Sequence, residues 1–521
     1  MPALSRQGQP PGRRLSLVRG QARSLMVIQL ARLGDFLQTT PLLAALRASH
    51  PQARIAVAVA PAVLPLARAC RHVDQVHILD PAHMREAAAG PPHLGLARLR
   101  GLCEPLWAEE AQEVYNLNLS HLAAGLAAGW SGARLRGWRP DPARGALTGE
   151  AWTPFVMHMV SDRRLTRLHL CDILASYAQP HGPPATRLDQ RVEPQALAAA
   201  RALLPSAGPR VVLQLGANHD LRRWPLESFA QLARGLAGQG ARLVITGAGG
   251  ERPLGHRLAA ALGPGAPLTD LMGQTDLPTL AGVLAQADLV VSADTGTLHL
   301  ATAVGARVLA LFMGPAQAHE TGPYGPGHLV LQARDACGPC LEDRPACQGQ
   351  APCRRLIGPA AAFQAGLRLL HGAPADLAAA GLDLPPGVEA LAGEMDGFGQ
   401  RYRPLAAQPL DQAGGLALAL RQAGRRLLRP SQAPGQTWRQ ELRAEHLPPG
   451  PDHRAALAGL SRAAGDLARA AAQADQATAQ RLLRQAPGLG ALARLVGPDA
   501  PPGLEAACRE AAEVLALAAD L

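Results

Sequence analysis

Hydrophobic and polar positions follow two alternating patterns along the first 372 residues. Short apolar, β-branched runs have the look of buried parallel strands, and apolar residues at helical spacing lie between them. The strand-like runs are 24–30, 53–61, 73–80, 113–120, 209–217, 241–249, 289–291 and 306–314. Helical patterns occupy 31–51, 121–130, 168–178, 229–240, 277–286, 298–305 and 360–372. Strands that alternate with helices in this way predict parallel, doubly wound sheets.

Composition shifts divide the chain into four parts. Residues 1–24 are rich in Pro, Gly, Gln and Arg and are expected to be a disordered basic segment. A Pro-rich stretch at 180–195 separates two Rossmann-like domains, 25–190 and 191–372. Residues 373–521 are rich in Ala, Leu, Arg and Gln, with hardly any β-branched runs, and are predicted to be a helical extension of unknown role. The expected fold class is α/β, with a cleft between the two domains.

The polar turn Asp294-Thr295-Gly296-Thr297 follows a buried strand and precedes a helix. The first turn of such a helix offers unpaired N–H groups and the positive end of the helix dipole, which suits a phosphate group. Gly296 permits close approach, and Thr295 and Thr297 add hydroxyl groups. The alternative is that Asp294 only caps the helix.

Three other candidates also follow strands. Asp35 lies just past the first strand, where its carboxylate could act as a general base on a sugar hydroxyl or could only cap the next helix. Arg222 and Arg223 could hold a diphosphate, or could form a solvated basic loop. Glu251, beyond a Gly-rich strand exit, would suit a ribose.

The large net charge says little about which class of partner the protein binds. The net charge is +10, but the chain has no Lys, so all 51 basic residues are Arg and a GC-rich genome explains this most simply. The charge fits anionic ligands or an anionic membrane face, while no nucleic-acid signature is present, so no nucleic-acid partner is expected. The chain lacks an apolar run of about 18 residues and a convincing signal peptide, which favours a cytoplasmic location.

Four cysteines cluster between residues 337 and 353. Cys337, Cys340, Cys347 and Cys353 are spaced C-x2-C-x6-C-x5-C. Four thiolates in so short a span could bind a structural zinc ion or an iron–sulfur cluster. The alternative is reduced structural thiols in a loop, since stable disulfides are disfavoured in a cytoplasmic protein.

Taken together, these motifs resemble glycosyltransferase family 9, the ADP-heptose:lipopolysaccharide heptosyltransferase family. The resemblance covers about residues 25–372 and rests on the order of GDFLQTTPLL, LRRWP, ITGAGGE and the run from LMGQTDLPTL to GARVLALF. It implies a GT-B fold and a bacterial, inverting transferase that moves a heptose or similar sugar from an ADP-sugar, with no obligatory cofactor. The implied acceptor is a lipopolysaccharide-core or other lipid-linked surface glycan at the inner face of the cytoplasmic membrane, which the protein would contact peripherally.

The resemblance also implies residue roles. Asp35 matches the proposed base. Asp294, Thr295 and Gly296 match the motif that holds the donor diphosphate and sugar, followed by Thr297, and His299 matches a motif histidine. Glu251 corresponds to the ribose ligand. Arg222 stands where many members have Lys.

One departure leaves the acceptor open. Many members have an Asp-x-(His/Gln)-Gly stretch in the acceptor region, where this chain has Asn116-Leu117-Asn118-Leu119. Two further hypotheses therefore remain: a non-catalytic GT-B scaffold or binding protein, and a GT-B sugar-nucleotide epimerase.

Overall fold

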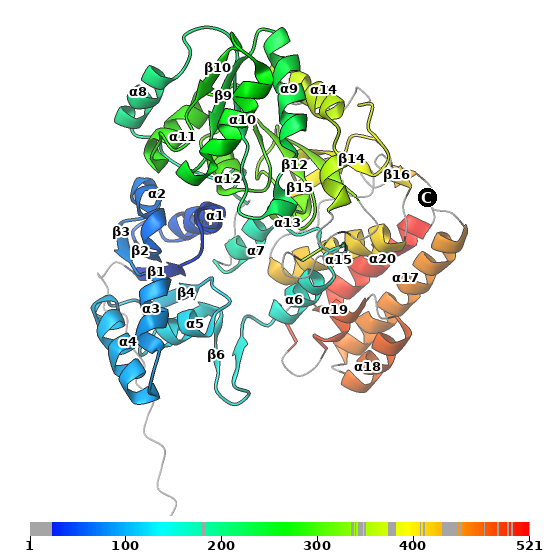
Figure 1. Cartoon of the computed structure of the whole chain (residues 1–521). Coiled ribbons are helices and arrows are strands. Elements are labelled where there is room, and N and C mark those ends of the chain that lie inside the picture. Colours follow the sequence, from blue (N-terminus) through cyan, green and yellow to red (C-terminus); the bar gives the residue numbers. More distant parts are fainter. Residues whose placement is uncertain are drawn as a thin grey trace, which may run out of the picture.

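The structure is a computed structural model that describes residues 23–178, 184–334, 351–372 and 382–519 with short gaps. The gaps are 407, 410–411, 430–445, 448–450, 474, 487–488, 497–499 and 502–503, and residues 338, 340, 341 and 347 are described singly. Two sheet-based domains face each other, and a group of helices lies beside both (Figure 1). All but the last two residues of the predicted basic segment 1–24 lie outside the described residues.

The N-terminal domain is built on a five-stranded parallel sheet with the order β3-β2-β1-β4-β5. Its strands are β1 (Ser24–Gln29), β2 (Arg54–Val59), β3 (Gln75–Ile78), β4 (Glu113–Asn116) and β5 (Arg134–Gly137). Its helices are α1 (Leu33–Ser49), η1 (Pro61–Val63), α2 (Leu64–Ala69), α3 (Pro81–Ala88), α4 (Pro92–Trp107) and α5 (His121–Ala128). Alternate residues of β1 enter two different apolar clusters, one on each face of the sheet. Burial on both faces explains the continuous apolar pattern of this strand.

The chain then crosses toward the second domain. β6 (Arg139–Asp141) and β7 (Ala146–Thr148) form an antiparallel hairpin, followed by α6 (Thr153–Ser161) and α7 (Leu170–Ser176). Figure 1 shows this hairpin between α5 on one side and α6 and α19 on the other.

The C-terminal domain is built on an eight-stranded sheet with the order β10-β9-β8-β11-β12-β13-β14-β15. Its parallel strands are β8 (Arg210–Gln214), β9 (Arg242–Thr246), β10 (Leu268–Asp270), β11 (Leu289–Ser292), β12 (Val308–Phe312) and β13 (Leu329–Ala333). Its helices are α8 (Pro194–Leu203), η2 (Asp220–Arg222), α9 (Leu226–Gly238), η3 (Gly249–Glu251), α10 (Arg252–Leu262), α11 (Leu277–Ala285), α12 (Gly296–Ala303), α13 (Ala318–Thr321), η4 (Pro352–Arg355) and α14 (Pro359–His371).

Residues 388–404 correct the prediction that everything after residue 372 is helical. β14 (Val388–Met395) pairs antiparallel with β13, and β15 (Gln400–Pro404) pairs with β14, so the second sheet continues to residue 404. The sequence concealed these strands because β14 buries Ala and Gly where strands usually carry β-branched residues.

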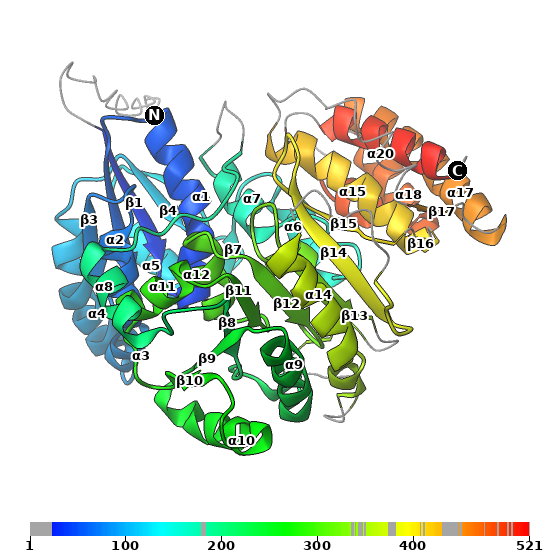
Figure 2. The same cartoon turned by 90° about the horizontal axis from the view of Figure 1, so that it is seen from above.

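The helical extension proper, α15 to α20, follows that sheet. Its elements are β16 (Gln408–Pro409), α15 (Gln412–Leu428), β17 (His446–Leu447), α17 (Pro451–Ala472), α18 (Gln476–Gln485), α19 (Gly490–Ala493) and α20 (Leu504–Ala519). Seen from above, its helices lie beside β14 and β15 and beside α6 and α7 (Figure 2). Across the described part of the chain, no helix combines the length and the apolar character needed to cross a membrane.

Candidate active site

A cavity of about 660 Å³ lies between the two domains. The N-terminal domain contributes the start of α1, and the C-terminal domain contributes the segments that follow β8, β9, β10, β11 and β12. Loops after parallel strands converge at one edge of a sheet, which is where open α/β folds bind ligands. The cavity brings together eight residues singled out from the sequence: Asp35, Arg222, Glu251, Asp294, Thr295, Gly296, Thr297 and His299.

Two glycines allow the domains to meet across this cavity. A Cβ atom on Gly34 would lie 2.8 Å from Cδ2 of His299, and one on Gly296 would lie 2.5 Å from Cδ2 of Leu33. Both distances are shorter than van der Waals contact, so a side chain at Gly34 would displace the buried His299 ring and one at Gly296 would displace the Leu33 side chain. Gly34 places Asp35 next to the α12 side of the cavity.

Asp35 caps the start of α1 and also lines the cavity. It is the third residue of α1, and its Oδ2 accepts a hydrogen bond from the backbone N–H of Arg32 at 3.0 Å. The same side chain is only partly buried and lines the cavity. The first turn of the helix thus orients a carboxylate that remains open to a ligand.

Asp294 is almost fully buried and is surrounded by donors. Its Oδ2 receives Nη1 of Arg222 at 2.8 Å and the Thr321 hydroxyl at 3.4 Å, while Nε2 of His299 lies 3.7 Å from its Oδ1. Burial alone would raise the pKa of Asp294, but His299, Arg222 and Thr321 outweigh it and hold the pKa below its usual value. The carboxylate is therefore ionised, and Arg222 is shared between it and the cavity.

The N-terminus of α12 forms the floor of the cavity. Thr295 is the N-cap, and its Oγ1 accepts the N–H of Leu298 at 3.4 Å. The Thr297 hydroxyl donates to Oε1 of Gln214 at 3.1 Å and is thus already engaged. Among the described residues, the N–H groups of Gly296 and Thr297 donate to no protein acceptor, so they remain available for an anion.

Glu251, from the segment after β9, also lines the cavity. It is the last residue of η3, and its Oε2 accepts the backbone N–H of Ala248 at 2.9 Å. One carboxylate oxygen is thus held by the turn, and the side chain lines the same cavity as Asp294.

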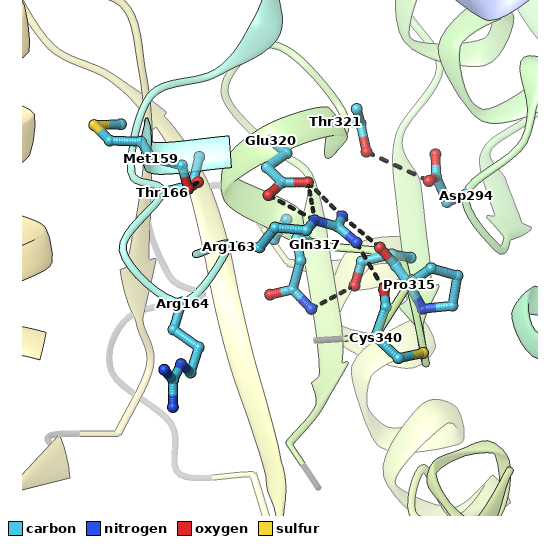
Figure 3. A network of polar contacts seen from close by, with 12 residues as sticks. Met159, Arg163, Arg164, Thr166, Asp294, Pro315, Gln317, Glu320, Thr321 and Cys340 are labelled. Carbon is cyan, nitrogen blue, oxygen red and sulfur yellow. Dashed lines mark hydrogen bonds and ion pairs between the residues drawn. The ribbon is translucent and has the colours of Figure 1, made fainter. Parts of the chain in front are cut away.

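A second set of cavity residues was missed from sequence. Arg163, which follows α6, donates through Nε to both carboxylate oxygens of Glu320 at 3.0 Å. Its Nη2 donates to the Pro315 carbonyl at 2.6 Å and its Nη1 to the Cys340 carbonyl at 2.9 Å (Figure 3). Burial raises the pKa of Glu320 even though Arg163 opposes this. The neighbouring Thr321 contacts Asp294, so this ion pair supports the side of the cavity that holds Asp294.

The expectation that site residues follow parallel strands could have identified part of this set. Glu320 and Thr321 come from the segment that follows β12, at the same sheet edge as Asp294. Arg163 has no such signal, because its partner Glu320 lies 157 residues away in the chain.

The polar side chains of the Asn116–Leu119 stretch form hydrogen bonds within the N-terminal sheet. Nδ2 of Asn116 donates to the Trp138 carbonyl at 2.8 Å, and Asn118 both accepts from the N–H of Leu30 at 2.9 Å and donates to the Ile28 carbonyl at 2.8 Å. These amides join the C-terminal ends of β1, β4 and β5, so the stretch has a structural role in the sheet.

The structure describes only three of the four clustered cysteines, because Cys337 lies outside the described residues. Cys340 and Cys353 are buried, and Cys347 is half-buried and accepts the N–H of Ala351 at 3.3 Å. Within the described part of the chain, no group of three or more His, Cys, Asp or Glu side chains is arranged to hold a metal ion.

Comparison with known proteins agrees with this geometry. The model of the family described as "Glycosyltransferase family 9 (heptosyltransferase)" matches residues 103–349. Over residues 103–349, this chain is similar to glycosyltransferase family 9. The family 9 region contains every cavity residue discussed above except those on α1, because the match begins after Asp35.

Curated relatives match over shorter stretches. Lipopolysaccharide heptosyltransferase 1 of Pseudomonas aeruginosa is 35% identical over 135 residues, which is 26% of this chain and 37% of that protein. Lipooligosaccharide heptosyltransferase 2 of Haemophilus influenzae is 32% identical over 113 residues, 21% of this chain and 32% of that protein. The matches thus span about a third of the length of these relatives.

A solved structure extends the likeness to the fold. The glycosyltransferase family 9 protein from Veillonella parvula superposes with a TM-score of 0.56 at 18% identity, covering 67% of this chain and 97% of that one. The fold is GT-B, two Rossmann-like domains facing a cleft, as expected from the sequence.

Proposed function

We propose that this protein is an inverting glycosyltransferase that moves a heptose or similar sugar from an ADP-sugar to a lipopolysaccharide-core or other surface-glycan acceptor. One observation carries the proposal. Asp35 of one domain and Asp294, Thr295 and Gly296 of the other line a single cavity of about 660 Å³. The curated relatives of the family 9 region are named heptosyltransferases, which supports the donor sugar.

On this proposal, the donor diphosphate lies at the N-terminus of α12. The N–H groups of Gly296 and Thr297 face its oxygens, and Arg222 supplies positive charge beside them. Glu251 accepts from the ribose hydroxyls. The helix end and Arg222 together stabilise the charge that develops on the departing ADP.

Asp35 removes the proton from the acceptor hydroxyl as the reaction proceeds. The freed oxygen forms a bond to the anomeric carbon, and the bond from that carbon to the diphosphate oxygen breaks, with its electron pair leaving on ADP. A single displacement from the opposite face inverts the anomeric configuration. The proton stays on Asp35 until solvent removes it.

The test is a calorimetric titration with ADP, UDP and GDP, followed by an ADP-release assay with ADP-heptose and a heptose-free core oligosaccharide. Selective binding of ADP and acceptor-dependent ADP release are expected. ADP binding without transfer would favour the scaffold hypothesis. Sugar-nucleotide conversion without any acceptor would favour the epimerase.

The site of action follows from the acceptor. A lipid-linked core glycan is assembled at the inner membrane, and the net charge of +10 suits a peripheral contact with its anionic cytoplasmic face. Retention on anionic vesicles, lost at high salt, would support this part of the proposal.

A further inference from the structure

A second cavity, of about 500 Å³, lies between the N-terminal domain and the helical extension. The β6–β7 hairpin and the start of α6 form one wall, and the first residue of α18 and the segment after α19 form the other. Its chemistry-bearing residues are Trp138, Arg144 and Glu150 on the first wall and Gln476 and Arg494 on the second. Figure 1 shows the hairpin and α19 facing each other at this place.

Trp138, on one wall of this cavity, lies at the edge of the N-terminal sheet from which β1 leads into α1 and Asp35. Trp138 directly follows β5, whose last residue Gly137 pairs with Asn116, and Asn116 pairs with Ile28 of β1. The exits of β1 and β5 are thus two strands apart at one edge, about 10 Å for backbones at ordinary strand spacing. In the proposed function this edge belongs to the domain that holds the acceptor.

Two of the three charged residues that line the cavity have partners of opposite charge. Glu150 lies 3.5 Å from the guanidinium groups of both Arg136 and Arg139 and also accepts the N–H of Gly137, so its charge is neutralised. Arg144 is paired with Asp141 at 3.1 Å.

Arg494 differs from these residues. Among the described residues it has neither an ion pair nor a side-chain hydrogen bond, and it lies close enough to His158 to help lower the pKa of that imidazole, although burial lowers it more. The extension therefore adds one uncompensated positive charge to a wall that faces an aromatic ring.

Trp138 supplies the other half of a recognition site. It is half-buried, and Leu495 and Val496 on the opposite wall are buried. An indole face suits the C–H face of a sugar ring, and a guanidinium forms strong, charge-assisted hydrogen bonds with carboxylate or phosphate oxygens.

We propose that this cavity is an acceptor subsite that binds an anionic sugar unit, with Trp138 against the ring and Arg494 on the carboxylate or phosphate. Its assignment to the acceptor rests on the proposed function, whereas binding of the anionic sugar does not. The extension would then select acceptors that carry such a unit beside the hydroxyl that receives the transferred sugar.

The test is saturation-transfer difference NMR on the full chain with excess ADP present, so that the proposed diphosphate site on α12 is occupied. The probes are glucuronate, glucose 6-phosphate, glucose and inorganic phosphate. Ring protons of glucuronate or glucose 6-phosphate should receive saturation, and whichever does so identifies the anion. Glucose should bind at least about tenfold more weakly, as expected for loss of a charge-assisted hydrogen bond.

Arg494→Gln and Trp138→Leu should each weaken this binding about tenfold or more. Arg484→Gln, an exposed arginine on α18 outside the cavity, is the matched control and should bind like the unaltered protein. Unchanged melting temperatures confirm that the variants fold.

Three results would overturn the proposal: no saturation of either acidic sugar, equal binding by Arg494→Gln, or displacement by inorganic phosphate as effective as by the sugar phosphate. Each differs from failure of the transferase function, because ADP binding and ADP release are measured separately. If transfer is found, Arg494→Gln should raise the KM for the acceptor and leave that for the ADP-sugar unchanged.

Discussion

At the scale of single residues, Asp35 combines a helix cap with the position of a base. Asp35→Ala should abolish transfer, because no other carboxylate of the N-terminal domain lines the cavity in the described part of the chain. ADP affinity should change little, since the proposed diphosphate site lies on α12. Activity and calorimetry on one preparation check both statements.

Loss of the cap also lowers stability, by about 1 kcal/mol. Asp80→Ala removes the N-cap of α3 away from the cavity and is a matched control for that cost. Equal loss of ADP binding and transfer in Asp35→Ala would contradict its role as the base.

Arg222 offers a second test at this scale. Arg222→Ala removes a donor to the proposed diphosphate site and leaves the buried Asp294 without its ion pair, so ADP should bind at least about tenfold more weakly. Arg222→Lys should recover much of this affinity. The adjacent Arg223→Ala removes the pair with Asp220 and a hydrogen bond to the Ala217 carbonyl but leaves Asp294 paired with Arg222, so it should bind ADP much more tightly than Arg222→Ala; equal weakening in both alanine variants would argue against the assignment.

Among single residues, prediction from sequence worked where a side chain directly follows a strand. Asp35, Glu251 and Asp294 occupy such places and share a cavity. Arg163 could not be predicted, because its position depends on how the segment after α6 packs against α13, and nothing local encodes a contact between residues that distant.

At the scale of elements, the Arg163–Glu320 pair joins the segment after α6 to α13. Both side chains are largely buried, so Arg163→Ala should reduce the free energy of unfolding by about 3 kcal/mol by leaving a buried carboxylate unpaired. Denaturant titration of Arg163→Ala, Glu320→Ala and the double variant should show that the two losses are not additive.

Arg164 provides the control for this prediction. It is the next residue, is mostly exposed and pairs only with Asp162, so Arg164→Ala should cost less than about 1 kcal/mol. Additive losses at Arg163 and Glu320 would show that the pair is not a coupled unit.

Whole elements were predictable when their pattern was strong. The parallel strands that flank the cavity lie close to their expected ranges, because burial on both faces demands continuous apolar runs. β14 and β15 were hidden, since antiparallel strands at the sheet margin can use Ala, Gly and charged residues.

At the scale of the whole molecule, Asp172 of α7 connects three parts of the chain. Its fully buried carboxylate accepts from the Tyr324 hydroxyl at 2.7 Å and from the N–H of Gln400 at 2.9 Å, and Arg421 and Arg429 of the extension lie nearby. Burial raises the pKa of Asp172 to about 6 despite these donors and charges.

This pKa gives a pH prediction with a definite sign. A raised carboxyl pKa means that the folded state binds a proton before the unfolded state does. Between about pH 6 and pH 4 acidification should therefore stabilise the fold through this group, by up to about 3 kcal/mol. Above the folded-state pKa, the cost of the buried charge is fully present.

The measurement must be a difference, because His169 and His328 have pKa values lowered by burial to about 3 and about 4. Both favour unfolding as the pH falls below 6.5. The unfolding free energy of the unaltered protein minus that of Asp172→Asn should rise from pH 7 to pH 4. A flat difference would show that Asp172 titrates normally.

The segment from β14 to α15 contacts both domains. β14 is bonded by its main chain to β13 of one domain, while Gly424 of α15 lies so close to Phe155 of α6 and to Leu168 that a Cβ there would clash. The segment from β14 to α15 therefore links the two domains on the side of α6. On the proposed function, this link should restrict how far the domains separate when ADP leaves, and that restriction would slow product release.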